Sequence, residues 1–173
     1  MKALPLHQPW AQLVALGKKR IETRAWTPPA SLFGTTIAIH ATAGGLSKRD
    51  ELALIERNEC IYDALKHLAD APADPCLDGA KAIAARLPRG AVICTVRLVR
   101  VTQISAHGAD RLALLNPEEH AFGDYTPGRF AWILDSAQAL AAPVPTTGRQ
   151  GIFDVPDHHL PGIPAQLPLD EAA

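Results

Sequence analysis

The pattern of apolar and polar residues predicts four to six strands. Residues 35–41 (TTIAIHA) alternate, so that Ile37 and Ile39 point to one face and His40 points to the other. Residues 91–101 (AVICTVRLVRV) are apolar on both faces, which is typical of a strand in a closed or covered sheet. The other strands are expected at 20–26, at 130–134, around Val144 and at 151–155.

Helices are expected before and between these strands. Residues 9–16 form a short amphipathic helix that Gly17 closes. A longer helix is expected at 47–69, because it begins with a variant of the capping box and continues with an apolar stripe. A shorter helix at 74–87 follows it.

Strands interrupted by one helical block favour the α+β class over a doubly wound sheet. The number of strands and the doubly apolar central strand fit a small β-barrel with a flanking N-terminal helix. We therefore expect a single domain at 1–155, with a helical insertion at about 47–88. Residues 156–173 are rich in proline and acidic residues and are interpreted as a C-terminal arm.

Composition and charge narrow the function classes. The 173 residues carry a net charge of −1, so a nucleic-acid contact would need a local basic patch. Residues 154–173 contain four acids and no lysine or arginine, and the excess of cations gathers at 17–24. No apolar run is long enough for a membrane span, and the N-terminus does not read as a signal peptide, so we expect a cytoplasmic protein. The three cysteines are widely spaced and the histidines scattered, so no metal and no cofactor is expected.

The most informative motif is residues 17–24 (GKKRIETR), between the first helix and a strand. In an extended chain Arg20, Glu22 and Arg24 project to one side and could bind a phosphate or a polar base edge. Lys19 could add a charge, or act as a nucleophile or base if it is desolvated. The alternative is a solvated edge strand whose charges pair with one another.

Two glycine-containing loops carry further candidate residues. In 122–130 (FGDYTPGRF), Tyr125 and Arg129 could offer a stacking ring and a cation at a pocket rim. In 146–151, glycines flank Arg149 and Gln150 and would let backbone N–H groups approach an anion. A tight loop and a plain hairpin turn, respectively, are the alternatives.

Two further groups remain open to both a functional and a structural role. Trp10 lies near the charged turn and could line a pocket, although core packing is favoured. Glu118, Glu119 and His120 have the residue types for acid–base chemistry, but they are interpreted as the surface start of a helix.

The pattern Gly-x-Lys-x-x-Glu-x-Arg, carried by Gly17, Lys19, Glu22 and Arg24, resembles the signature of the ASCH-domain family, of the longer bacterial type. The stretches TIAIHA, FGDYTPGRFAWIL and GRQGIFDV resemble the same family and follow in the same order. The resemblance implies a PUA-like β-barrel with a cleft beside the first helix, and a role in RNA or modified-nucleotide chemistry.

The resemblance also implies possible activities. Some small members of the family are amidohydrolases acting on N4-acylated cytidines, and ribonuclease activity is attributed to the family. Lys19 matches the catalytic lysine of the small amidohydrolases, whereas Glu22 stands where they carry threonine. Glu22 could serve as a base instead.

The favoured hypothesis is an RNA- or modified-nucleotide-binding protein with a cationic cleft. A metal-independent hydrolase of RNA or acylated cytidine, with Lys19 and Glu22 as catalytic residues, is one alternative, and a structural or partner-binding domain is another. The expected ligand-binding residues are Trp10, Lys19, Glu22, Arg24, His40, Tyr125, Arg129, Arg149 and Gln150. The binding and hydrolase hypotheses require the cations of the three segments to meet at one concave opening.

Overall fold

The computed structural model describes residues 1–156, except for the side chains of Asp110, Ala113 and Leu115. Nearly all of the expected C-terminal arm therefore lies outside the described residues. The described chain contains the strands β1 (Lys2–Leu6), β2 (Ile21–Arg24), β3 (Thr36–Ala41), β4 (Ala91–Gln103), β5 (Phe130–Pro145) and β6 (Phe153–Asp154). Its α-helices are α1 (Trp10–Ala15), α2 (Lys48–Arg57), α3 (Glu59–Leu65), α4 (Leu77–Arg86), α5 (Ala106–Leu115) and α6 (Pro117–Ala121), and two short 3₁₀ turns lie at Ala30–Leu32 and Lys66–Leu68.

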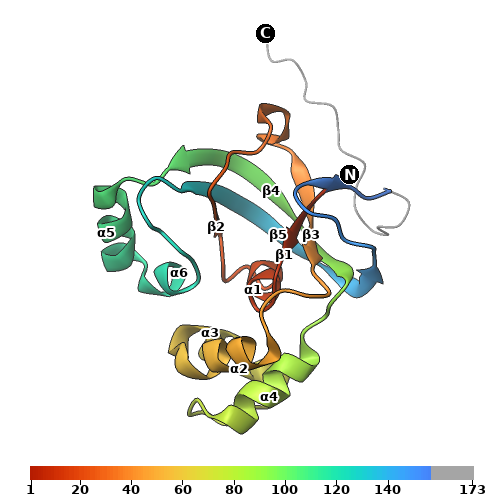
Figure 1. The fold of residues 1–173 in the computed structure, drawn as a ribbon, viewed down its shortest axis with the longest axis vertical. Helices are drawn as coiled ribbons and strands as arrows, with labels where there is room; N and C mark the ends of the chain where they lie inside the picture. The colour runs from red at the N-terminus through yellow and green to blue at the C-terminus, as the bar shows by residue number, and fades with distance from the viewer. Residues whose placement is uncertain (157–173) are drawn as a thin grey trace.

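The strands form one mixed sheet in the order β2-β5-β4-β3-β1-β6 (Figure 1). β1 and β3 are parallel, and the other neighbouring strands are antiparallel. Register shifts interrupt the long β4–β5 ladder, as expected where paired strands bend strongly. The predicted α+β class is confirmed. The predicted closed barrel is not shown, because β2 and β6 remain the two edges of the sheet within the described residues.

Several elements differ from those expected. β1 precedes the first helix and was not predicted, because it is only five residues long and contains Pro5. The helix expected at 47–69 is broken at Asn58, whose side chain accepts the Ile61 N–H and starts α3. β5 runs on to Pro145 and absorbs the separate strand expected around Val144. The helix α5 was not predicted.

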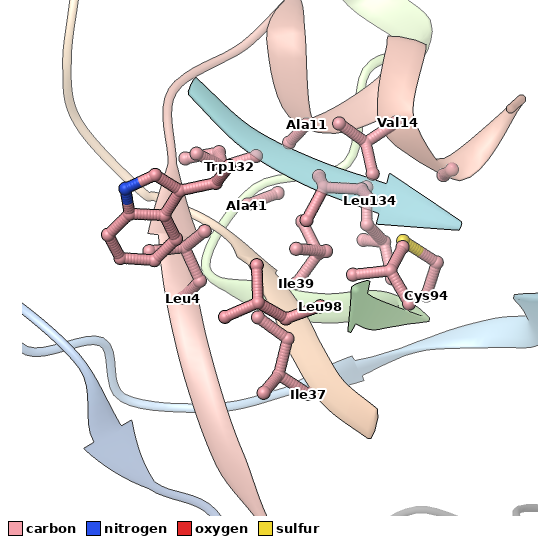
Figure 2. Close-up of a cluster of buried hydrophobic side chains, with 14 of the residues drawn as sticks. Leu4, Ala11, Val14, Ile37, Ile39, Ala41, Cys94, Leu98, Trp132 and Leu134 are labelled. Carbon is pink, nitrogen blue, oxygen red and sulfur yellow. The ribbon is translucent and has the colours of Figure 1, made fainter. Parts of the chain in front are cut away.

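The main core lies between the sheet and α1. Leu4, Ile39, Leu98 and Trp132 are buried on the sheet, and Val14 packs against them from α1 (Figure 2).

A second apolar cluster joins α1 to the helices α2, α3 and α4. Leu13 of α1 packs with Ile55 of α2, Tyr62 and Leu65 of α3 and Ile83 of α4. The helix α1 therefore has the sheet on one side and the group α2–α4 on the other, as Figure 1 shows. This double packing holds the turn that follows α1, where the charged motif begins.

The three cysteines are free thiols, and burial in the core raises the pKa of Cys94 to about 12. Among the helices within residues 1–156, none has both the length and the apolar composition that crossing a bilayer would require.

Candidate functional site

A cavity of about 780 Å³ opens where the end of β1, the start of α1 and the strand β2 meet two later loops. This volume lies within the usual range of small-molecule pockets, about 300–1,000 Å³. Seven of the nine predicted ligand-binding residues line it: Trp10, Lys19, Glu22, Arg24, Arg129, Arg149 and Gln150. The tertiary structure thus brings three segments that are far apart in the sequence to one concave opening.

Lys19 lies in the turn after α1, with its side chain directed inward. Gly17 has a φ of +68°, which a glycine adopts easily, and the Lys19 N–H donates to Leu13 O at 3.1 Å. The ammonium group donates to Ile21 O at 2.5 Å and lies 3.6 Å from Glu22 Oε2. Desolvation by burial lowers the pKa of Lys19, and the carboxylates of Glu22 and Glu119 oppose that shift.

Glu22 lies on β2 between two cations. Its Oε1 is 2.9 Å from Arg24 Nε, and its Oε2 faces the Lys19 ammonium. Arg20 was expected to project to the same side as Glu22 and Arg24, but the cation opposite Arg24 is Lys19. Arg20 precedes β2 and is exposed, while Lys19 occupies the inner position because the turn after α1 directs it there.

Arg24 joins two strands that do not pair with each other. Its Nη2 donates to Pro5 O at 2.7 Å, so the guanidinium connects β2 to β1 across the cavity. Pro5 is thereby held at the cavity wall. The charges of the motif therefore pair with one another, as the structural alternative anticipated, but they do so within a cavity and not on a solvated edge.

Arg129 and Arg149 enter from the two later loops. Arg129 donates from Nη2 to Thr23 O at 3.1 Å, and its Nε lies 3.3 Å from Asp124 Oδ2. Hydrogen bonds from the hydroxyl and the N–H of Thr126, helped by the Arg129 guanidinium, lower the pKa of Asp124. Arg149 is exposed, and within residues 1–156 it makes no ion pair or hydrogen bond. Its guanidinium is therefore available to a ligand.

Tyr125 and His40 do not line the cavity. Tyr125 is buried, and its hydroxyl donates to Glu119 Oε1 at 3.1 Å; burial and that carboxylate raise its pKa. His40 is buried behind the loop that carries Arg149, with Nε2 2.9 Å from Thr146 O and its ring edge-on to Phe153. The structure therefore places both rings as supports of the loops and not as surfaces for a base.

Glu119 has an internal role that the sequence analysis did not assign. It was interpreted as part of a surface helix start, yet its side chain is buried. Its carboxylate accepts the N–H groups of Arg20 at 2.7 Å and Ile21 at 3.1 Å, in addition to the Tyr125 hydroxyl. The helix start itself was correct, since α6 begins at Pro117. Glu119 connects α6 to the turn that holds Lys19.

His7 also lines the cavity and was not singled out from the sequence. It lies between β1 and α1 and is exposed. A lone histidine beside a proline-containing turn carries no sequence signal, so only the fold could reveal this position. Pro5, Leu6, Thr23, Leu54 and Phe122 are among the other lining residues.

The arrangement favours binding of an anion with a polar, planar group attached. Guanidinium groups at the rim match phosphate oxygens, and the inner carboxylate accepts hydrogen bonds. Trp10 is half-buried and adds an aromatic surface. Within residues 1–156, His, Cys, Asp and Glu side chains do not gather in a group of three that could hold a metal ion.

Comparison with known proteins identifies the family. The ASCH domain model matches residues 4–142. Crystal structures of two mutant forms of an ASCH protein from Zymomonas mobilis each superpose with a TM-score of 0.50 at 16% identity. In both, the match covers 91% of this chain, and it covers 91% and 89% of the two solved chains. No curated protein matches the chain significantly. The family match spans most of the sequence, including the charged turn and β2, and the chain therefore belongs to the ASCH domain family.

Proposed function

We propose that this protein binds RNA or a modified nucleotide in the cavity described above. The observation that supports this most directly is the convergence of Arg24, Arg129 and Arg149 on one opening that also holds Glu22 and Trp10. Membership of the ASCH family, which is similar to the RNA-binding PUA domains, agrees with this assignment.

Each part of the cavity matches a part of a nucleotide. Arg149 and Arg129 offer planar guanidinium groups to a phosphate. Glu22 can accept from a base amino group such as that of cytosine. Trp10 can stack on a base, as aromatic side chains do in proteins that read single-stranded RNA.

We expect Arg149→Ala to weaken the binding of a short single-stranded RNA about five-fold at low salt, which corresponds to about 1 kcal/mol. The reason is that Arg149 has no partner among the described residues and is free to contact phosphate. The slope of log affinity against log salt should fall by about 1. Fluorescence anisotropy with a labelled RNA over a range of KCl concentrations measures both quantities.

The matched control is Arg100→Ala. Arg100 is an exposed arginine on β4 that does not line the cavity. The substitution Arg100→Ala removes the same charge from the protein but should leave the slope of log affinity against log salt unchanged. Equal effects of the two substitutions would reduce the proposal to non-specific attraction, and absence of RNA binding at low salt would favour a structural or partner-binding domain.

A second candidate function, a hydrolase of RNA or N4-acylated cytidine, is favoured by one observation. The Lys19 ammonium lies beside Glu22, and burial lowers its pKa. A lysine with a lowered pKa carries its reactive, uncharged amine at a lower pH than usual. Lys19 and Glu22 would then form the nucleophilic or acid–base pair, without a metal ion.

For this candidate we expect Glu22→Gln and Lys19→Ala each to lower turnover at least about 100-fold, the usual range for a lost general acid or base. The assay uses N4-acetylcytidine and short RNAs, with and without a chelator. Lys18→Ala is the control, because Lys18 is the exposed neighbour of Lys19 in the same turn. Turnover that survives both site substitutions would exclude the proposed roles, and turnover abolished by the chelator would contradict the metal-independent reaction.

A further inference from the structure

His7 stands at the cavity wall with one ring nitrogen already engaged. Its Nδ1 lies 2.7 Å from the hydroxyl of Thr42, just after β3. That hydroxyl also contacts the carbonyl oxygen of Gly44, at 2.5 Å. The imidazole, the hydroxyl and the carbonyl are thus linked by two consecutive hydrogen bonds beside the cavity.

These two hydrogen bonds determine which nitrogen of the His7 ring carries the proton. A threonine hydroxyl has one hydrogen, and a carbonyl oxygen can only accept. The Thr42 hydroxyl must therefore donate to Gly44 O, and it can only accept from His7. Nδ1 of His7 then carries the proton, and in the neutral ring Nε2 keeps its lone pair.

The ring is also held in place sterically. The backbone of Gly45 lies so close that a Cβ there would be 2.6 Å from His7 Nδ1, and the φ of Gly45 is +149°. A residue with a side chain at position 45 would displace the imidazole. The hydrogen bond and the glycine together hold His7 in one orientation at the wall of the cavity.

The two carboxylates that line the cavity, those of Glu22 and Asp124, already have partners, although each keeps lone pairs for a ligand. Glu22 is paired with Arg24 and Lys19, and Asp124 accepts from Thr126 and lies beside Arg129. Lysine and arginine can only donate. Within residues 1–156, Nε2 of His7 makes no hydrogen bond of its own.

We propose that His7 is a specificity-determining ligand contact, whose Nε2 accepts a hydrogen bond from a donor group of the bound nucleotide. The donor is the ribose 2′-hydroxyl or the amino group of the base, while the phosphate lies against the arginines. This inference deepens the proposed nucleotide-binding function and rests on it.

The state of the ring is measured directly by NMR. Protein labelled with ¹⁵N-histidine, at a pH where the ring is neutral, should show the Nδ1–H form of His7 from the two ring ¹⁵N shifts. Thr42→Val, which keeps the shape and removes the hydroxyl, should release this preference. A wild-type His7 found with its proton on Nε2 would overturn the inference without bearing on nucleotide binding.

The contact is tested with His7→Asn. The amide nitrogen of asparagine can replace Nδ1 toward Thr42, but nothing replaces Nε2. The probes are cytidine 5′-monophosphate, which has both donors, its 2′-deoxy form and uridine 5′-monophosphate. We expect the variant to bind cytidine 5′-monophosphate about five-fold more weakly than the wild type does, the usual effect of one lost hydrogen bond.

The other two probes identify the donor. If the 2′-hydroxyl is the partner, the variant and the wild type bind the deoxy form equally; if the base amino group is, they bind uridine 5′-monophosphate equally. A variant that loses the same factor for all three probes, or for none, overturns the role of His7 while leaving the proposed function intact. If the wild type binds the short RNA but none of the three probes, the role of His7 is overturned while RNA binding stands; if it binds neither the RNA nor the probes, both proposals are overturned.

Discussion

Replacing Glu119 by alanine is expected to lower the free energy of unfolding by about 3 kcal/mol, because three donors lose the buried carboxylate that accepts their hydrogen bonds. These donors are the N–H groups of Arg20 and Ile21 and the hydroxyl of Tyr125. The Glu119 charge also raises the pKa of Lys19, so its removal should lower that pKa further. Urea unfolding followed by tryptophan fluorescence measures the loss, and the slope against urea should not change.

The adjacent residue provides the control. Glu118 is exposed on the same helix, and Glu118→Ala should change the free energy of unfolding by no more than about 0.5 kcal/mol. If Glu119→Ala were as mild as this control, the carboxylate would not be the link between α6 and the turn that carries Lys19.

The second large effect is expected at Trp132, where substitution by alanine should cost about 4 kcal/mol of stability. The side chain is fully buried, its ring meets that of Trp26 edge-on at 4.9 Å, and its N–H donates to Trp26 O at 3.2 Å. It also lies directly opposite Glu22 in the β2–β5 ladder. Loss of the indole should therefore loosen the edge strand that carries Glu22 and Arg24, and weaken ligand binding as well.

Two further variants separate these effects. Trp132→Phe keeps an aromatic ring but loses the N–H, and should cost about 1–2 kcal/mol with the cavity preserved. Phe33→Ala removes an aromatic ring that is 42% exposed and should be nearly neutral. Thermal unfolding ranks the three variants, and a Trp132→Ala protein as stable as Phe33→Ala would contradict the role given to this core residue.

The cavity depends on side-chain contacts that connect elements not joined by strand pairing. Within residues 1–156, β2 pairs only with β5 and ends the sheet on that side. Arg24 reaches from it to Pro5 of β1, and Glu119 holds the preceding turn from α6. The binding groups are therefore supported by buried polar contacts, which are costly to leave unsatisfied and hold one geometry.

Strands were predicted most accurately where apolar and polar residues alternate or where the segment is apolar on both faces. The strands Thr36–Ala41 and Ala91–Gln103 lie where the apolar patterns of residues 35–41 and 91–101 predicted them. β5 was predicted as two separate strands, at 130–134 and around Val144, because the exposed stretch between them has no clear apolar pattern. The break at Asn58 was missed because one capping side chain outweighs an apolar stripe that continues past it.

For the site, local sequence determined the residue types and the short-range geometry. The turn at Gly17 and the spacing of Lys19, Glu22 and Arg24 place three charges within one stretch, and their family pattern is visible without coordinates. Packing decided what each side chain faces. Lys19, and not Arg20, pairs with Glu22, and the side chain of Glu119 is buried. Tyr125 and His40 contact neighbouring loops and do not line the cavity.

The sequence by itself thus determined the α+β class, the family and the set of charged groups, since these depend on residue types and on spacings of a few positions. Only the tertiary structure decided that Arg129, Arg149 and His7 share a cavity with Glu22, and that the sheet keeps two edges. These features depend on contacts between distant parts of the sequence, such as Arg129 and Thr23, which are 106 positions apart. The burial of the core, and not a local preference, brings such residues together.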